Sequence, residues 1–165
     1  MLEIGQIHSP ADCAAVKDLV LEFVAWANSI DPDAQTASTF KDLDAELDGL
    51  PGIYGPPTGS FLLAMNDGLA VGCVAFREVD AKTVELKRMY VRPGQRGLGV
   101  GFKLVQDLIE VARAQGRNRM VLSSYHTMTG AHKIYRAVGF QDVAAPEDLP
   151  KLYVGRVIFM EMGLS

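Results

Sequence analysis

The feature that most constrains this chain is a glycine-rich segment at residues 96–101, whose sequence is RGLGVG. A strand-like apolar run ends just before it at residues 92–94, and an apolar stripe with helical spacing follows it directly. The first backbone N–H groups of a helix and its dipole favour an anion, and glycine lets a phosphate approach those groups. The segment therefore predicts a phosphate-binding turn between a strand and a helix.

Two nucleotide-binding motifs do not match this segment. The dinucleotide motif G-x-G-x-x-G needs a glycine where Phe102 stands, and no acidic residue ends the next strand at residues 123–124. The P-loop motif needs a lysine and then a hydroxyl residue after the last glycine, where this chain again has Phe102. Neither a dinucleotide nor ATP or GTP is therefore expected as the ligand.

The spacing of apolar residues predicts one α/β domain over residues 1–165. Ser9 and Asp12 form a capping box, so a helix is expected to begin at Pro10. Further helices are expected over residues 38–47, 100–115 and 130–138. Strands are expected over residues 61–65, 69–78, 83–91, 120–123, 140–143 and 156–162. This order predicts a mixed sheet with helices on its faces.

Composition and charge exclude several classes of function. The net charge of −4 comes without a block of lysine or arginine, so the chain lacks the basic surface that nucleic acids need. No apolar run approaches the roughly 20 residues of a membrane span, and the first residues lack the basic start of a signal peptide. Cys13 and Cys73 are far apart and outside any cysteine or histidine cluster, so neither disulfides nor a metal site are expected. We expect a cytoplasmic protein.

Three segments together resemble the GNAT family of N-acetyltransferases. Besides the glycine segment, residues 85–93 (ELKRMYVRP) are similar to that family's fourth strand, and residues 131–140 (AHKIYRAVGF) to its last helix. The three segments occur in the family's order and on the expected elements. The resemblance implies an α/β fold of the α+β type, with a mixed, mostly antiparallel sheet of six to seven strands flanked by about four helices.

The resemblance also implies acetyl-CoA as the acyl donor. In the family, the backbone of the fourth strand holds the pantetheine arm, and the glycine segment surrounds the pyrophosphate. The positions that match the donor site are Met89, Tyr90, Val91, Arg96, Gly97, Leu98, Gly99, Val100, Gly101, Thr127 and Met128. Met128 stands where the family often has an asparagine, so Thr127 or Thr129 is expected to take over that contact.

Two residues match catalytic positions of the family. Tyr135 stands where the family places the acid that protonates the departing thiolate, and a phenol has a suitable basicity for this step. Glu85 stands in the register of a general base that takes a proton from the attacking amine. The alternatives are a tyrosine that only packs in its helix, and a glutamate that only pairs with Lys87, Arg88 or a neighbouring strand, with solvent as the base.

The resulting hypothesis is direct transfer of an acetyl group from acetyl-CoA to an amine of a small molecule or peptide while both substrates are bound. A non-catalytic acyl-CoA sensor is the alternative, and the presence of both Tyr135 and Glu85 favours an enzyme. The sequence carries no code for the acceptor, although Trp26, Tyr54 and Tyr153 are aromatic candidates for its pocket, together with Phe40. A homodimer is a further alternative, formed by edge pairing of a strand near residues 157–160.

Overall fold

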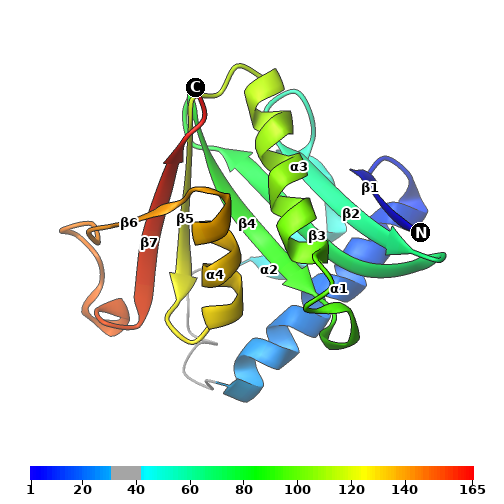
Figure 1. The fold of residues 1–165 in the computed structure, drawn as a ribbon, viewed down its shortest axis with the longest axis horizontal. Helices are drawn as coiled ribbons and strands as arrows, with labels where there is room; N and C mark the ends of the chain where they lie inside the picture. Colours follow the sequence, from blue (N-terminus) through cyan, green and yellow to red (C-terminus); the bar gives the residue numbers. More distant parts are fainter. Residues whose placement is uncertain (31–41) are drawn as a thin grey trace.

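The computed structural model describes residues 1–30 and 42–165, and these residues form one sheet of seven strands with four α-helices (Figure 1). The strands are β1 (Leu2–Gln6), β2 (Ser60–Asn66), β3 (Leu69–Glu78), β4 (Thr83–Val91), β5 (Arg119–Tyr125), β6 (Gln141–Val143) and β7 (Val157–Gly163). The helices are α1 (Pro10–Ile30), α2 (Leu43–Asp48), α3 (Val100–Ala114) and α4 (Thr129–Val138). The strand order in the sheet is β1-β2-β3-β4-β5-β7-β6.

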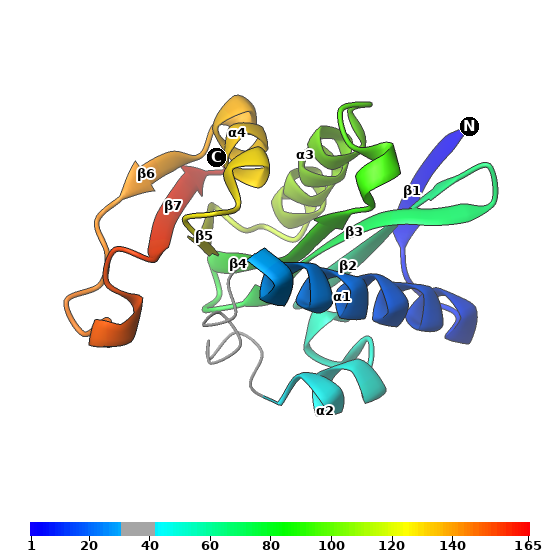
Figure 2. The same cartoon turned by 90° about the horizontal axis from the view of Figure 1, so that it is seen from below.

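The sheet separates two apolar cores, each covered by a pair of helices. Figure 2 shows α3 and α4 on one face of the sheet and α1 and α2 on the other. Leu104 and Leu108 of α3 are fully buried in the first core, and Leu19 of α1 is fully buried in the second. All strand pairs except β4 and β5 are antiparallel, so the expected mixed, mostly antiparallel sheet is confirmed. No helix in the described residues is long and apolar enough to span a bilayer.

The local signals in the sequence account for most element boundaries. The backbone N–H of Asp12 bonds to Ser9 Oγ and the N–H of Ser9 bonds to Asp12 Oδ2, both at 3.1 Å, which confirms the capping box of α1. The second helix was expected over residues 38–47; its part up to residue 41 lies outside the described residues, and α2 ends before Gly49 as predicted. Strand β1 was not predicted, because its five residues include Gly5 and are too few to show an alternating pattern.

The position of β7 limits the edge pairing expected near residues 157–160. Strand β7 lies inside the sheet, bonded to β5 on one side and to β6 on the other. Residues 159 and 160 therefore have strand partners on both sides, whereas residues 157 and 158 pair with β5 alone, so little open edge remains for a second copy and the homodimer stays a prediction. The edge on this side belongs to β6, which has only three residues, all of them exposed.

Strands β4 and β5 begin side by side and then diverge. They pair in parallel only from Thr83 to Glu85 on β4 and from Arg119 to Val121 on β5. Beyond this short ladder the strands separate, which is visible in Figure 1 as a wedge in front of which α4 lies. The rest of β4, up to Val91, therefore has no strand partner on its β5 side among the described residues.

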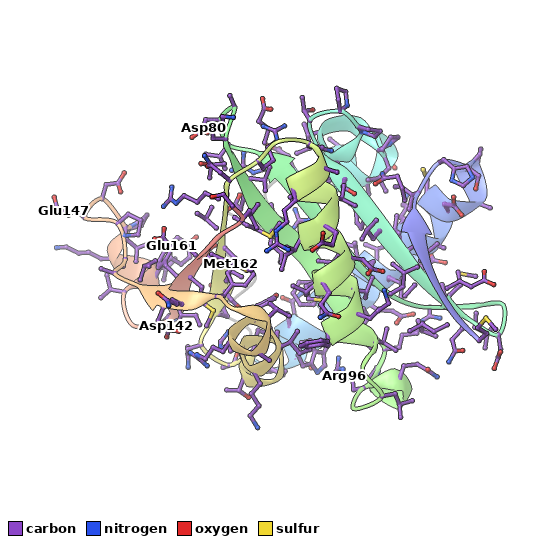
Figure 3. The ribbon with its side chains drawn as sticks, turned by 45° about the horizontal axis from the view of Figure 1, so that its top comes forward. Asp80, Arg96, Asp142, Glu147, Glu161 and Met162 are labelled. Carbon is purple, nitrogen blue, oxygen red and sulfur yellow. The ribbon has the colours of Figure 1, made fainter. Side chains whose placement is uncertain are left out.

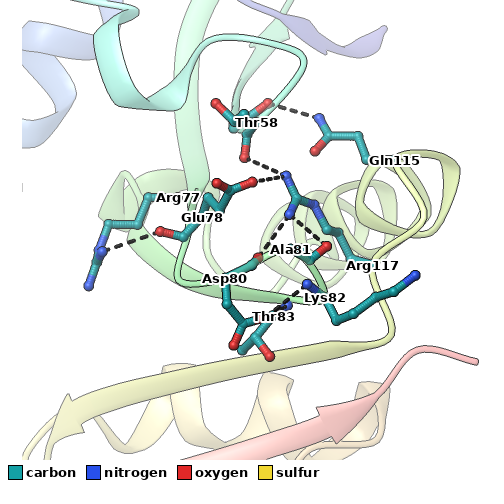
Figure 4. A network of polar contacts seen from close by, with 10 residues as sticks. Thr58, Arg77, Glu78, Asp80, Ala81, Lys82, Thr83, Gln115 and Arg117 are labelled. Atoms are coloured by element: carbon teal, nitrogen blue, oxygen red, sulfur yellow. Dashed lines mark hydrogen bonds and ion pairs between the residues drawn. The ribbon is translucent and has the colours of Figure 1, made fainter.

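An arginine network fixes the closed end of this wedge (Figure 4). Arg117, between α3 and β5, donates from Nη1 to the carbonyl groups of Asp80 and Ala81, each at 3.0 Å. Its Nη2 donates to the carbonyl of Thr58 at 3.2 Å and pairs with Glu78 Oε2 at 2.7 Å. The turn between β3 and β4 is thereby tied to the start of β5, so that the two parallel strands begin together.

A β-bulge at Arg88 bends β4 where the wedge opens. Cys73 pairs with Tyr90, and Ala75 pairs with Lys87, so two steps along β3 correspond to three along β4. Arg88 adopts a φ of 60°, which is rare for a residue with a side chain. The thiol of Cys73 donates to the Arg88 carbonyl at 3.3 Å, so a buried cysteine satisfies a backbone acceptor that the bulge displaces.

The Arg88 side chain is buried against α2. Its Nε and Nη2 contact Glu46 Oε2 and Oε1 at 2.8 and 3.0 Å, and the Tyr54 hydroxyl donates to Glu46 Oε1 at 2.9 Å. Burial alone would raise the pKa of Glu46, but the hydrogen bonds and charge of Arg88 outweigh it and lower the pKa. The ionised pair anchors α2 to the bulge.

Candidate functional site

A cavity of about 840 Å³ lies where β4 and β5 separate. Its walls come from both strands, from the glycine segment before α3, from the start of α4 and from α1. Nine of the eleven expected donor-site residues line it, together with Glu85 and Tyr135. The exceptions are Leu98, which is exposed, and Val100, which is buried in the core below α3. The structure thus brings the expected site together around one opening.

The glycine segment forms the expected uncapped helix start. Gly97 and Gly99 have φ values of 79° and 85°, a region that side chains disfavour, and a Cβ on either would meet nothing within 4 Å. Gly99 is the N-cap of α3 without a side-chain hydrogen bond, and the N–H of Lys103 donates to its carbonyl at 3.0 Å. The earlier N–H groups of the first turn have no acceptor inside the helix, so they can bind an anion.

Gly101 is a glycine for a different reason. A Cβ at this position would come within 2.8 Å of Ile134 Cδ1 on α4 and of Met89 Cε on β4. Gly101 is itself buried inside the first turn of α3. Its missing side chain therefore lets α3, α4 and β4 pack closely, while Gly101 also lines the cavity, so its expected main-chain contact with a phosphate stays a prediction.

Arg96 is held over an aromatic surface at the mouth of the cavity. Its guanidinium carbon lies 4.6 Å from the ring centre of Trp26 and 5.6 Å from that of Tyr90. Its Nε also donates to the carbonyl of Val91 at 2.8 Å. Figure 3 shows Arg96 beside the start of α3, at the end of the sheet opposite Asp80. Trp26, on α1, thus positions the cation beside the glycine turn, a contact that no local pattern around Trp26 indicated.

The middle of the cavity offers polar groups for an amide-containing arm. The β5-facing edge of β4 near Met89 and Val91 has no strand partner, so backbone groups there face the opening. Across the cavity, Met128 is the N-cap of α4, and Thr127 Oγ1 is buried without a hydrogen-bond partner. A buried hydroxyl without a partner is costly unless a ligand satisfies it. These groups are of the kind that the pantetheine arm of coenzyme A could bond, and the contact of Thr127 in place of the missing asparagine stays a prediction.

Tyr135 packs against its neighbours and also lines the cavity. Its ring contacts Phe140 edge-on at 5.8 Å between centroids, and only 4% of the residue is accessible. Burial raises the pKa of its phenol, because the phenolate would be desolvated. The hydroxyl therefore stays protonated at neutral pH, as a proton donor requires. The ring of Tyr135 packs in its helix, as one alternative expected. Because Tyr135 also lines the cavity, its catalytic role stays a prediction.

Glu85 lies on the face of the sheet that α1 and α2 cover, whereas the glycine segment leads into α3 on the other face. Its Oε1 accepts from Arg77 Nε at 2.8 Å, and Arg77 is its direct neighbour on β3. Pairing with a neighbouring strand was one of the two alternatives, and it is realised here. Glu85 also lines the cavity, and Arg77 bonds to only one of its two carboxylate oxygens, so the ion pair does not remove it from the candidate base position.

The remaining candidate residues lie partly in the cavity and partly outside it. Trp26 and Tyr153 line the cavity, whereas Tyr54 is buried in the core beneath α1, and Phe40 lies outside the described residues. Burial raises the pKa of the Cys73 thiol to about 12, so this cysteine stays protonated and is no nucleophile. Among the residues that the structure describes, no three His, Cys, Asp or Glu side chains gather closely enough to hold a metal ion.

One contact in the wall was not expected from the sequence. His132 Nε2 lies 2.9 Å from Ser124 Oγ, and Ser124 lines the cavity. Burial lowers the pKa of His132, so the imidazole is neutral at physiological pH. The two residues come from β5 and α4, so their contact depends on how the helix folds back onto the strand, which no sequence spacing shows.

Comparisons with known proteins agree with this geometry. Residues 21–140 match the model of the acetyltransferase (GNAT) family. An uncharacterized N-acetyltransferase of Schizosaccharomyces pombe is 31% identical over 166 residues, covering 99% of this chain and 96% of that protein. An N-acetylaspartate synthetase of Danio rerio is 36% identical over 108 residues, which is 64% of this chain and 38% of that longer protein.

A solved structure shows the same fold with a ligand. The PaiA N-acetyltransferase of Thermoplasma acidophilum, in complex with coenzyme A, superimposes with a TM-score of 0.78. The alignment covers 99% of each chain at 16% sequence identity. At this identity the likeness concerns the fold, and the family model together with the Schizosaccharomyces pombe relative carries the assignment.

We expect Gly99→Val to weaken coenzyme A binding at least tenfold, because valine strongly disfavours a φ of 85° and its side chain would project beside the uncapped N–H groups. Isothermal titration calorimetry with coenzyme A measures the effect. Gly94→Ala is the matched control, since Gly94 is exposed near the same turn and a Cβ there meets nothing within 4 Å. Equal affinity of both variants would contradict the assignment of the phosphate site.

Proposed function

Since the chain belongs to the GNAT family and is an acetyl-CoA-dependent N-acetyltransferase, we propose that it moves the acetyl group directly to an amine of a small molecule or peptide. The observation that carries this proposal is the wedge between β4 and β5. A donor held by the glycine segment reaches the wedge from the α3 and α4 side, while Glu85 and Arg77 lie on the side of the sheet that α1 and α2 cover. Both substrates can thus meet in one opening without a covalent enzyme intermediate.

The donor would be held mainly by main-chain groups. The N–H groups at the start of α3 would bind the pyrophosphate, with the Arg96 guanidinium beside them. The unpaired edge of β4 at Met89 and Val91 and the hydroxyl of Thr127 would bind the pantetheine arm. When bound, acetyl-CoA supplies an activated thioester; the protein supplies its position in the wedge.

The backbone also offers a stabilising group for the reaction. The N–H of Met89 would donate to the acyl oxygen, where negative charge grows as the amine attacks. Such a donor typically contributes about 2.7–4 kcal/mol to the stability of the transition state. Because the group is main-chain, substitution of the Met89 side chain leaves this donor in place.

Two side chains would move protons. Glu85 would accept a proton from the acceptor's ammonium group, directly or through water, because a protonated amine has no lone pair with which to attack. Tyr135 would give its proton to the departing thiolate, and its raised pKa keeps that proton available. As the amide forms, the attacking nitrogen would release its second proton to solvent, the phenolate of Tyr135 would regain a proton from solvent through the cavity, and Glu85 would release the proton that it took.

The experiment that tests this function is release of the coenzyme A thiol from acetyl-CoA over a panel of amines. The panel contains amino acids, polyamines, aminoglycosides and peptides; aspartate is included because the Danio rerio relative is named for N-acetylaspartate. We expect thiol release above the acceptor-free rate with at least one class. Binding of acetyl-CoA without turnover across the whole panel would favour the alternative, a non-catalytic acyl-CoA sensor.

We expect Tyr135→Phe to slow transfer roughly ten- to a thousand-fold, because the variant lacks the proposed proton donor for the thiolate. Acetyl-CoA affinity should change little, since the phenyl ring keeps the packing against Phe140. Because burial raises the pKa of the phenol, the wild-type rate should not fall on the alkaline side below a pH of about 10. An unchanged rate in the variant would reduce Tyr135 to a packing residue.

We expect Glu85→Gln to lower the rate roughly ten- to a hundred-fold at neutral pH, because an amide cannot accept the proton of the ammonium group. The deficit should shrink as the pH approaches about 10, where alkyl amines lose their proton to solvent. Glu161→Gln is the matched control: this glutamate also pairs with an arginine on the next strand, Arg119, but lies outside the cavity. Equal rates in both variants would assign the base to solvent.

A further inference from the structure

Lys87 lies beside Glu85 in the cavity and has no partner within residues 1–30 and 42–165, which the structure describes. Lys87 is opposite Ala75 on β3, and Arg77 is opposite Glu85, so Arg77, Glu85 and Lys87 share one face of the sheet. This is the face on which Ala75 packs into the core beneath α1. All three charged side chains line the cavity, on the side where the acceptor would enter.

The charges around Lys87 do not cancel. Arg77 pairs with Glu85 at 2.8 Å, and Arg88 pairs with Glu46 at 2.8 Å. Lys87 has neither a hydrogen bond nor an ion pair with any residue that the structure describes, although it is half-buried. Among the residues that the structure describes, one positive charge is therefore left over in a partly desolvated cavity. Buried charges are normally paired, so an unpaired one in a binding cavity indicates an anionic ligand.

The protonation of this lysine responds to the same surroundings. Burial, and next the charge of Arg88, lower the pKa of Lys87, while Glu85 and Glu46 act in the opposite direction and Arg77 adds to the lowering. An incoming anion would stabilise the ammonium form and reverse this effect. The position of Lys87 in the cavity, without a partner among the described residues, supports an anionic ligand. The lowered pKa of Lys87 agrees with that position.

We infer that Lys87 binds a carboxylate of the acceptor, so that the preferred acceptor is an amine that also carries a carboxylate, as an amino acid does. This inference rests on the proposed transfer to an amine. Glu85 and Lys87 are two residues apart on one face of β4, so their Cα atoms lie about 6.6 Å apart. The pair presents a negative and a positive group side by side, which complements an acceptor with an ammonium and a carboxylate group.

Matched substrate pairs test the inference. The probes are amino acids and the amines that lack only the carboxylate: alanine with ethylamine, phenylalanine with phenethylamine, and aspartate with β-alanine as a pair that differs by one carboxylate. We expect wild-type kcat/KM to favour the carboxylate-bearing member of at least one of the first two pairs by roughly ten- to a hundred-fold. Equal kcat/KM within every pair would overturn the inference.

The variant Lys87→Met removes the charge and keeps a similar length of apolar side chain. We expect it to abolish the preference by raising KM for the carboxylate-bearing members, with kcat, the KM for acetyl-CoA and the rates of the simple amines little changed. Lys87→Arg should restore part of the preference. Lys82→Met, in the exposed turn between β3 and β4, is the matched control and should behave as wild type.

The outcomes separate this inference from the proposed function. If amines are acetylated without regard to their carboxylate, the inference fails and the proposed function stands. If Lys87→Met lowers kcat equally for both members of each pair while thermal unfolding is unchanged, Lys87 acts on proton transfer and the inference again fails. If acetyl-CoA binds and no amine of the panel is acetylated, both are overturned.

Discussion

The ion pair between Arg88 and Glu46 is the interaction on which the site depends. It holds a residue with an unfavourable φ of 60° in the middle of a strand, a conformation that costs on the order of 1–2 kcal/mol for a residue with a side chain. The side chain of Arg88 is only 2% exposed, so water cannot take the place of Glu46 as a partner of the guanidinium group. Removal of Glu46 would break a buried ion pair, which typically costs about 3–5 kcal/mol and so exceeds the strain.

The bulge acts together with the network at the other end of the wedge. Arg117 ties the β3 and β4 turn to the start of β5, so these strands must begin in contact. Arg88 bends β4 away a few residues later, so the strands must also part. Two buried arginines thus define the length of the parallel ladder, and the cavity lies where that ladder stops. Interruption of the sheet exposes backbone groups that a regular ladder would have used.

The sequence predicted those parts of the fold and site that depend on near neighbours. The capping box of α1, the hairpin of β2 and β3 and the glycine turn before α3 each follow from a few adjacent residues, and the structure has all of them. The bulge, the stacking of Arg96 on Trp26 and the position of β7 between β5 and β6 join residues that are far apart in the chain. Gly101 shows the limit most clearly, because the residues that exclude its side chain come from β4 and α4.

The same distinction separates the two sides of the wedge. The proposed donor side would rely on main-chain groups and on the start of a helix, which need small residues in a fixed order and so leave a motif in the sequence. The proposed acceptor side would rely on the charges of Arg77, Glu85 and Lys87, whose relation to one another is set by the register of β3 against β4. A register that includes a bulge shifts side chains from one face to the other, so the faces cannot be assigned by counting alternate residues. Lys87 and Arg88 are adjacent in the chain and would point to opposite faces in a regular strand; the bulge places both on the acceptor side, where Glu46 neutralises only one of them.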